Sequence, residues 1–345
     1  MKKNIALFQT AMDVGGIQKS LINLLNRIDY EKYNIDLYIL GGGSFFKQIP
    51  SKVNVIVLDN KKWYKYVPFK AVYHLTKVDK SIKYDVSIDF NGYNNYLSSY
   101  ALKIDAKRKV LFVHNDFKKK YLNERKFRIL YNLSKKKYGM YDDIVSVSLG
   151  VKNSFYELTG IKAKYVIPNY IDTKKIIDSS MDNIYFHVDD ENINLCFLGR
   201  LVYQKGLDLL FPILKKYSKV NPEFHLYVIG DGDKKDELIK QVEDLDLCDN
   251  VTFLGSKINP YPYVKMCDYL ILNSRYEGQG MVALEAMCLG LKVIMPKNLS
   301  EYLDIDYIDI KDIDKISKFR KKINKLDDYN KMIDVKIDEL FGGEI

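Results

Sequence analysis

The chain has 345 residues, 47% of them hydrophobic, and a formal net charge of +9. This length favours two globular domains, each large enough to bury its own hydrophobic core. No apolar run approaches the roughly 20 residues that a membrane-spanning helix needs, and the short one after Met1, Lys2 and Lys3 is too brief for a signal peptide. We therefore expect neither a transmembrane segment nor a signal peptide, and any membrane association to be peripheral.

The positive charge comes largely from Lys in a chain that is also rich in Ile, Asn and Tyr. It reflects either a compositional bias of the genome or a preference for polyanionic partners such as anionic lipid, nucleic acid or phosphorylated substrates. Cys196, Cys248, Cys267 and Cys288 form no CxxC pair, which is typical of free thiols in a reducing compartment. We therefore predict a cytoplasmic protein.

In the first half, short apolar strands alternate with helical or polar stretches. Several strands are apolar on both faces, which is typical of a parallel sheet. After the first strand, Gly15 and Gly16 precede a stretch from Ile17 to Ile28 whose apolar residues recur at helical spacing. The predicted strands cover residues 5–10, 35–40, 53–58, 85–89, 110–113, 144–147 and 165–167.

A polar, irregular stretch from about Thr173 to Asn192 separates this series from a second one. Its predicted strands cover residues 195–198, 226–229, 251–254, 269–272 and 293–295. This alternation predicts an α/β protein with two Rossmann-like, doubly wound domains, over 1–170 and 171–327. A terminal helix over about 328–345 is either an ordinary terminal helix or packs back onto the first domain.

The segment Asn273–Gly280 leaves a predicted strand and leads directly into a helical run that begins at Met281. Its glycines allow a ligand to approach, and free amides at a helix start attract phosphate. Glu277 and Glu285 stand eight residues apart and could accept hydrogen bonds from hydroxyls at opposite ends of one ligand. The alternative is a glycine turn before a packed helix, with Glu285 at the surface.

Cationic side chains are expected beside such a helix start, because a diphosphate carries about two negative charges and a helix terminus offsets little of that. Arg200 and Lys205 follow the first strand of the second domain and offer a forked guanidinium and a flexible ammonium. For Lys205 alone, the alternative is a surface loop in a Lys-rich protein.

These motifs resemble, in their order, the retaining glycosyltransferases of the GT-B fold known as glycosyltransferase family 4, and in particular bacterial members that build capsular or other surface polysaccharides. The resemblance rests on Gly199-Arg200-Leu201, Lys205-Gly206, Gly230-Asp231-Gly232, Phe253-Leu254-Gly255, Glu277-Gly278 and Glu285, with Gly15-Gly16, His114 and Pro168–Asp172 in the first domain. It implies two domains facing a central cleft, with the acceptor on the first and the donor on the second. It also implies transfer from a nucleotide-diphosphate sugar, with UDP as the family-weighted choice, to a saccharide or lipid-linked saccharide, without a metal or another cofactor.

The resemblance also implies roles for individual residues. Arg200 and Lys205 would bind the diphosphate, Glu285 the ribose and Glu277 the hydroxyls of the transferred sugar. His114 would contact that sugar or the departing phosphate, although a packing histidine is the alternative. The implied catalytic residues are His114 and Glu277, and the implied donor-binding residues are Gly15, Gly16, Asn169, Arg200, Lys205, Ser256, Lys257, Gly278, Gly280, Met281, Val282 and Glu285.

Two departures from the family pattern affect this reading. Tyr170 stands where a glycine commonly follows Asn169, which puts the role of Asn169 in question. The usual glycine-rich loop after Pro296 is shortened to Lys297–Glu301. We therefore expect the part of the donor pocket that contacts the nucleobase or the sugar to be altered.

Two basic regions mark the predicted acceptor side. In one, over residues 61–70, basic residues alternate with aromatic residues; the other runs from Lys118 through Lys137. They favour either an anionic membrane surface or solvated helix faces. Rival functions are a nucleotide-sugar epimerase or phosphorylase of the same fold, and a basic protein that binds nucleic acid without catalysis. No nucleic-acid-binding motif supports the last of these, so we expect no nucleic-acid partner.

Overall fold

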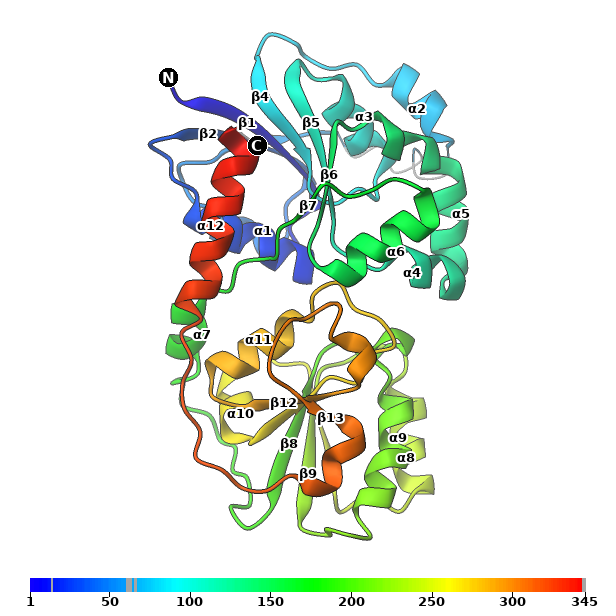
Figure 1. Cartoon of the computed structure of the whole chain (residues 1–345), viewed down its shortest axis with the longest axis vertical. Coiled ribbons are helices and arrows are strands. Elements are labelled where there is room, and N and C mark those ends of the chain that lie inside the picture. The colour runs from blue at the N-terminus through cyan, green and yellow to red at the C-terminus, as the bar shows by residue number, and fades with distance from the viewer. Residues whose placement is uncertain (14, 60–63, 65–66, 343–345) are drawn as a thin grey trace. The chain divides into compact units, whose positions relative to one another are not determined.

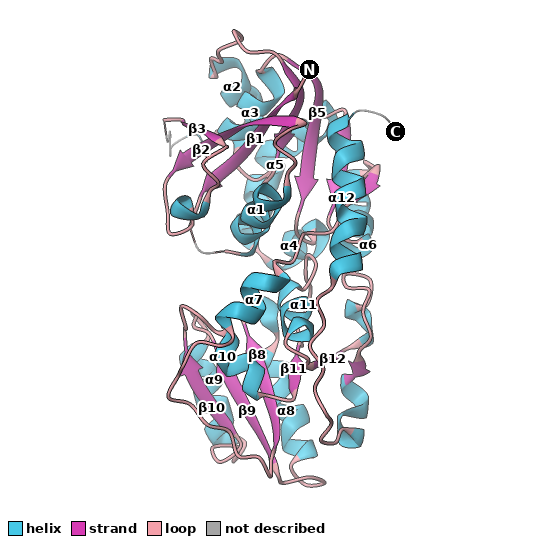
Figure 2. Cartoon of the chain, turned by 90° about the vertical axis from the view of Figure 1, so that its left-hand side faces the viewer, coloured by secondary structure: helices cyan, strands magenta, loops and turns pink. Residues whose placement is uncertain are grey.

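The computed structural model describes residues 1–13, 15–59, 64 and 67–342. Half of the basic and aromatic segment at 61–70 therefore lies outside the described residues. The chain divides into two compact units, Met1–Tyr170 with Asp328–Ile345, and Ile171–Asp327. Each unit is an α/β domain in which helices flank a sheet (Figures 1 and 2).

The sheet of the first unit has seven strands in the order β3-β2-β1-β4-β5-β6-β7, and all neighbouring strands run parallel. Its strands are β1 (Lys3–Ala11), β2 (Tyr33–Gly41), β3 (Asn54–Val57), β4 (Tyr84–Asp89), β5 (Ala106–Val113), β6 (Asp143–Ser146) and β7 (Tyr165–Val166). Its helices are α1 (Gly16–Arg27), α2 (Phe69–Leu75), α3 (Asn95–Lys103), α4 (Phe117–Asn123), α5 (Arg125–Ser134), α6 (Leu149–Thr159) and α12 (Asp327–Gly342).

Both faces of this sheet are covered, which explains why its strands read as apolar runs. Ile5 and Leu7 of β1 pack with α1 and α12 on one face. Ala6 and Phe8 pack on the other face with an aromatic cluster from α3 and its neighbours. Successive side chains of β1 point to opposite faces of the sheet, so this one strand contributes to the hydrophobic core on each face.

The helix α12 closes the core of the first unit (Figure 2). Its apolar residues Ile333, Ile337, Leu340 and Phe341 are buried in the same cluster as α1. Ion pairs of Arg27 with Asp334 and of Lys32 with Asp338 join α12 to α1 and to the loop that follows α1. The last helix of the chain is therefore part of the domain that contains the first strand.

Some charged and aromatic residues expected at the surface are buried instead. Lys137 has an exposure of 0%, with Nζ 3.0 Å from Ser98 Oγ, and burial lowers its pKa to about 8. The prediction that Lys137 extends the basic surface region is wrong. Tyr64 and Phe69, the described aromatics of the segment at 61–70, are also buried.

The second unit holds a six-stranded parallel sheet in the order β10-β9-β8-β11-β12-β13. Its strands are β8 (Ile193–Leu198), β9 (Phe224–Ile229), β10 (Val251–Gly255), β11 (Tyr269–Ile271), β12 (Lys292–Met295) and β13 (Ile308–Asp309). Its helices are α7 (Thr173–Ser179), α8 (Leu207–Tyr217), α9 (Lys235–Asp244), α10 (Tyr261–Met266) and α11 (Met281–Cys288).

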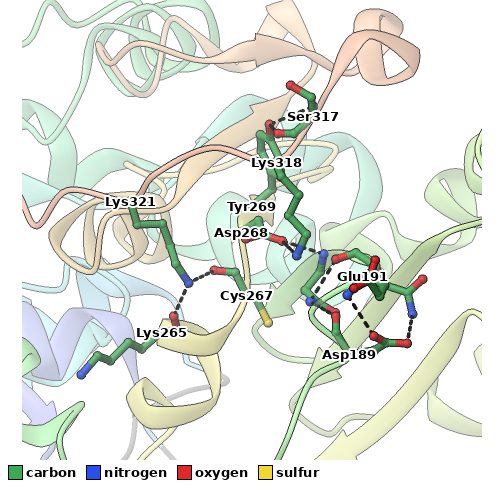
Figure 3. A network of polar contacts seen from close by, with 11 residues as sticks. Asp189, Glu191, Lys265, Cys267, Asp268, Tyr269, Ser317, Lys318 and Lys321 are labelled. Atoms are coloured by element: carbon green, nitrogen blue, oxygen red, sulfur yellow. Dashed lines mark hydrogen bonds and ion pairs between the residues drawn. The ribbon is translucent and has the colours of Figure 1, made fainter.

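A polar network fastens the segment after β13 to the amino end of β11 (Figure 3). Asp268 pairs with Lys318 at 3.0 Å, and the Tyr269 hydroxyl donates to the Ser317 carbonyl at 2.7 Å. Lys321 donates to the carbonyls of Lys265 and Cys267. These bonds hold the chain that leads toward α12 along the second unit.

Both sheets confirm the predicted Rossmann-like architecture. In each sheet the strand order reverses once, between β1 and β4 in the first unit and between β8 and β11 in the second. Ligands of such folds bind outside the carboxyl ends of the strands at this reversal. Across the described ranges, no helix combines the length and the apolar character that crossing a bilayer requires.

Candidate functional site

In the second unit, the loops after β8 and β9 pack backbone against backbone. The amide of Leu201 donates to the Asp231 carbonyl at 2.8 Å. A Cβ on Gly230, where φ is +148°, would lie 1.9 Å from the Gly199 carbonyl oxygen. A side chain at Gly230 is therefore excluded by the neighbouring loop.

The loop after β8 is also joined to the loop after β11, across the reversal of strand order. Gly206 adopts a left-handed conformation at φ +65°, and a Cβ there would lie 2.3 Å from the Asn273 carbonyl oxygen. The Asn273 side chain donates to the Gly206 carbonyl at 2.9 Å. The Gln204 side chain donates to the Tyr276 carbonyl, also at 2.9 Å. These contacts join residues 67 and 72 positions apart in the chain and bring two predicted motifs into one site.

The centre of this site is an ion pair between Lys205 and Glu277. Lys205 Nζ lies 2.6 Å from Glu277 Oε1, with side-chain exposures of 14% and 8%. The Ser274 hydroxyl donates to the same oxygen at 2.5 Å. Among the described residues none bonds to Oε2, so that oxygen can accept a hydrogen bond from a ligand. The alternative of a solvated surface lysine does not hold for Lys205.

Arg275 also contacts residues on both sides of Lys205, a role that the sequence did not predict. Its guanidinium pairs with Asp208 at 2.5 Å and stacks on the Tyr203 ring, with 3.9 Å from Cζ to the ring centroid. The hydrogen bond with Arg275 lowers the pKa of Asp208. This bidentate pair fixes the loop that presents Lys205 against the loop that presents Glu277.

The helix α11 begins at the site. Gly280 caps it in a left-handed conformation with φ +66°, and the helix runs from Met281 with its first amides lacking acceptors within the helix. Glu285 lies in α11 and is only 5% exposed. The alternative of Glu285 as a surface charge is therefore wrong. Gly278 is buried in the loop between Glu277 and α11.

The remaining predicted donor residues of this unit lie in two other loops. Arg200 is exposed in the loop after β8. Ser256 is exposed after β10, and Lys257 Nζ lies 5.0 Å from the centroid of the Tyr263 ring. Packing on this ring restricts the ammonium of Lys257, whereas the guanidinium of Arg200 faces solvent.

In the first unit, Gly15 caps α1 and Gly16 is its exposed first residue. Asn169 accepts a hydrogen bond from the Ser20 hydroxyl through its side chain, and one from the Tyr329 hydroxyl through its carbonyl. Asn169 is therefore held between α1 and α12.

Tyr170 follows Asn169 where the family pattern has glycine, and its ring is buried beneath Arg27, 5.3 Å from Cζ to the ring centroid. Burial raises the pKa of its hydroxyl. The bulky side chain thus fills a packing position against α1, which gives the departure from the family pattern a structural reason.

His114 follows β5 and is buried between two aromatic rings. Its ring centroid lies 4.6 Å from that of Phe90 and 5.8 Å from that of Phe112. Burial disfavours the imidazolium form and lowers the pKa of His114 to about 3. The side chain is therefore neutral near pH 7 and is poorly suited to attract an anion electrostatically.

The comparisons with known proteins agree with this geometry. Residues 183–302 match the model of a family described as glycosyl transferases group 1. An uncharacterized glycosyltransferase of Haemophilus influenzae is 25% identical over 303 residues, covering 85% of this chain and 80% of that protein. The O-antigen biosynthesis glycosyltransferase WclY of Escherichia coli is 30% identical over 156 residues, covering 45% of this chain and 43% of that protein. These matches support a glycosyltransferase of group 1.

The solved structures share the fold of both units. Anabaena HepE in complex with UDP and glucose superposes with a TM-score of 0.62 at 18% identity, covering 98% of this chain and 90% of that chain. Identity at this level carries the fold alone. The predicted GT-B fold is confirmed.

Proposed function

We propose that the chain is a retaining glycosyltransferase of family 4 that moves a sugar from a UDP-sugar to a saccharide or lipid-linked saccharide acceptor in surface polysaccharide biosynthesis, capsule included. The buried pair of Lys205 and Glu277 at the start of α11 is the observation that carries this proposal. This pair places a cation and a carboxylate beside the first amides of α11, at the point where the strand order of the second sheet reverses. The matches to WclY and to the UDP-bound structure of HepE support the substrate class.

We assign each residue of the site to the part of the nucleotide-sugar donor that it would bind. Lys205 and the first amides of α11 bind the diphosphate, together with Arg200. Glu277 accepts a hydrogen bond from a sugar hydroxyl through Oε2, while Ser274 and Lys205 hold Oε1. Glu285 contacts the ribose. The neutral His114 contacts the sugar and does not act as a base.

In this proposal the acceptor attacks from the face of the sugar that the diphosphate leaves, and the leaving phosphate takes the acceptor proton. Glu277 then positions the sugar and is not a nucleophile. The charge that develops on the leaving diphosphate is stabilised by Lys205, Arg200 and the helix start, without a metal or another cofactor.

A thermal-shift screen over nucleoside diphosphates and nucleotide sugars tests the proposal. A ligand present at 100 times its Kd stabilises the native state by about 2.7 kcal/mol. We expect UDP and at least one UDP-sugar to raise the unfolding temperature. Donor hydrolysis that rises on adding acceptor supports transfer, whereas epimerised donor formed without acceptor contradicts it, and so does binding of DNA alone.

We also propose that the protein acts in the cytoplasm and binds the inner face of the plasma membrane peripherally through α4, α5 and the turn after them. Leu122, Ile129 and Met140 are 58%, 51% and 41% exposed on these elements. The same elements carry exposed basic residues, namely Lys118, Arg125, Lys126, Arg128, Lys135 and Lys136. Exposed apolar side chains among bases suit an anionic lipid surface.

Sedimentation with liposomes tests the membrane proposal. The protein should sediment at low salt with vesicles that contain anionic lipid and stay in solution with vesicles of phosphatidylcholine alone. Added salt should release it, because the attraction is electrostatic. A protein that ignores anionic vesicles at low salt would refute this part of the proposal.

A further inference from the structure

The second unit has a cavity of about 260 Å³ where the loop after β8 meets the amino-terminal parts of α8 and α9. The two helices lie side by side and share one hydrophobic core (Figure 1). Lys205 and Glu277, both of which the structure describes, do not line this cavity. Pockets for drug-sized ligands enclose about 300–1,000 Å³, so this cavity has room for a ligand of about one ring.

Hydrogen bonds hold the walls of this cavity in place. The amide of Lys234 donates to the Leu201 carbonyl at 3.0 Å, which ties the start of α9 to the loop after β8. The Gln241 side chain donates to the Asp208 carbonyl at 2.9 Å, which ties α9 to α8. The cavity is therefore built into the fold, and a ligand binds without ordering a loop.

One part of the lining is apolar. Val202, Leu207 and Leu238 contribute aliphatic side chains, and the last two of these are buried. Tyr203 contributes a half-exposed aromatic ring. Surfaces of this kind pack against the C–H groups on the faces of a ring ligand. We therefore expect a ligand with apolar faces.

The charged groups of the lining are already paired. The Asp208 carboxylate accepts from the Arg275 guanidinium at 2.8 and 2.5 Å. The Lys234 ammonium donates to both carboxylate oxygens of Glu237 at 2.8 Å. Each charge of the lining therefore has a counter-charge, and the cavity has no electrostatic preference for an ion. This balance favours an uncharged ligand.

The polar atoms that remain available include both donors and acceptors. The Lys234 ammonium has three N–H groups and uses two of them on Glu237. The Glu237 carboxylate has about four lone-pair sites, and this pair takes two of them. The Gln241 amino group uses one N–H on the Asp208 carbonyl, and among the described residues none donates to Gln241 Oε1. A hydroxyl group can both donate and accept, so a ligand with several hydroxyls satisfies this mixture.

We propose that this cavity binds one ring of an uncharged saccharide, with a C–H face against Tyr203 and hydroxyls on Glu237 and Gln241. It is a second sugar site, separate from the donor sugar that is assigned to Glu277. The choice of a saccharide among uncharged ligands with several hydroxyls rests on the proposed function, in which acceptor and product are saccharides. Tyr203 stands two residues before Lys205, so a saccharide chain bound here stays beside the loop that holds the donor.

Saturation-transfer NMR with free glucose, galactose and N-acetylglucosamine tests this site, with saturating UDP added to fill the donor site. Glu237→Ala and Gln241→Met remove the two acceptors, and methionine keeps the length of the Gln241 side chain. Glu243→Ala is the matched control, because Glu243 is an exposed carboxylate of the same helix that does not line the cavity.

With UDP present, at least one of the three sugars should bind the wild type. Glu237→Ala and Gln241→Met should each weaken this binding about tenfold, as expected for one lost hydrogen bond, and Glu243→Ala should leave it unchanged. Loss of the sugar signal on adding UDP would place the sugar in the donor site and overturn the inference. Displacement of the sugar by uridine, equal binding by the wild type and both cavity variants, an equal loss in Glu243→Ala, or failure of all three sugars to bind the wild type would overturn it too.

Thermal unfolding of each variant checks that the fold is kept. Should Gln241→Met unfold early because its bond to α8 is lost, Glu237→Ala decides the question, since Glu237 is exposed. If UDP does not bind but a sugar binds through Glu237 and Gln241, the proposed donor is wrong and this site stands.

Discussion

Removing one charge from the pair of Lys205 and Glu277 should destabilise the second unit, whereas removing both should not. Glu277→Gln leaves Lys205 only 14% exposed and without its counter-charge. Breaking a buried ion pair in this way costs about 3–5 kcal/mol, and the residual exposure of both side chains favours the lower end. At about 2–4 °C per kcal/mol for a unit of this size, the unfolding temperature should fall by about 6–12 °C.

The same variants should separate binding from transfer. Lys205→Met should weaken UDP binding, because the diphosphate loses a cation. Glu277→Gln should keep UDP binding, since Lys205 is released for the diphosphate, and should strongly depress transfer. Differential scanning calorimetry and UDP titration of both single variants and the double variant provide the measurements. Equal loss of UDP binding in the two single variants would refute the assigned roles, and so would a double variant as unstable as the sum of both.

Three further outcomes follow from the structure. Because the pKa of His114 falls from 6.5 in the unfolded chain to about 3 when folded, its contribution to stability is present above pH 6.5 and decreases below it. Between pH 6 and 5, the free energy of unfolding measured in urea should fall by about 1.2 kcal/mol more for the wild type than for His114→Gln, and equal decreases would contradict this. Gly230→Ala should lower the free energy of unfolding by at least about 2 kcal/mol in the same assay, because the new Cβ meets the Gly199 carbonyl oxygen. Replacing Leu122 and Ile129 by Ser should reduce sedimentation with anionic vesicles while changing stability by about 0.5 kcal/mol or less per residue, and undiminished sedimentation would count against the membrane surface.

The sheets were predictable because most strands are buried on both faces and read as apolar runs. The central strand β1 was predicted as residues 5–10 and extends over Lys3–Ala11. The edge strand β13 was missed, since Ile308–Asp309 is too short to show a period. Lys137 was assigned to the surface because it ends a run of lysines, and only its packing against Ser98 and Asn95 reveals that it is buried.

The order of the motifs pointed to the loops that carry Lys205 and Glu277. What these residues contact depends on the neighbouring positions of β8 and β11 in the sheet, which bring the two loops together. Nothing in the sequence shows that Ser274 shares Oε1 of Glu277 with Lys205, or that Arg275 reaches Asp208.

The position of α12 in the first unit's core affects how the chain can fold as it is made. The first 170 residues leave the ribosome before α12 is synthesised. Until then the core of the first unit lacks Ile333, Ile337, Leu340 and Phe341 and is partly exposed. The second unit is continuous and can complete its core earlier. Domains usually fold in order of synthesis. Here the domain that is started first is finished last, and a nascent chain stalled before α12 would expose the apolar face of α1.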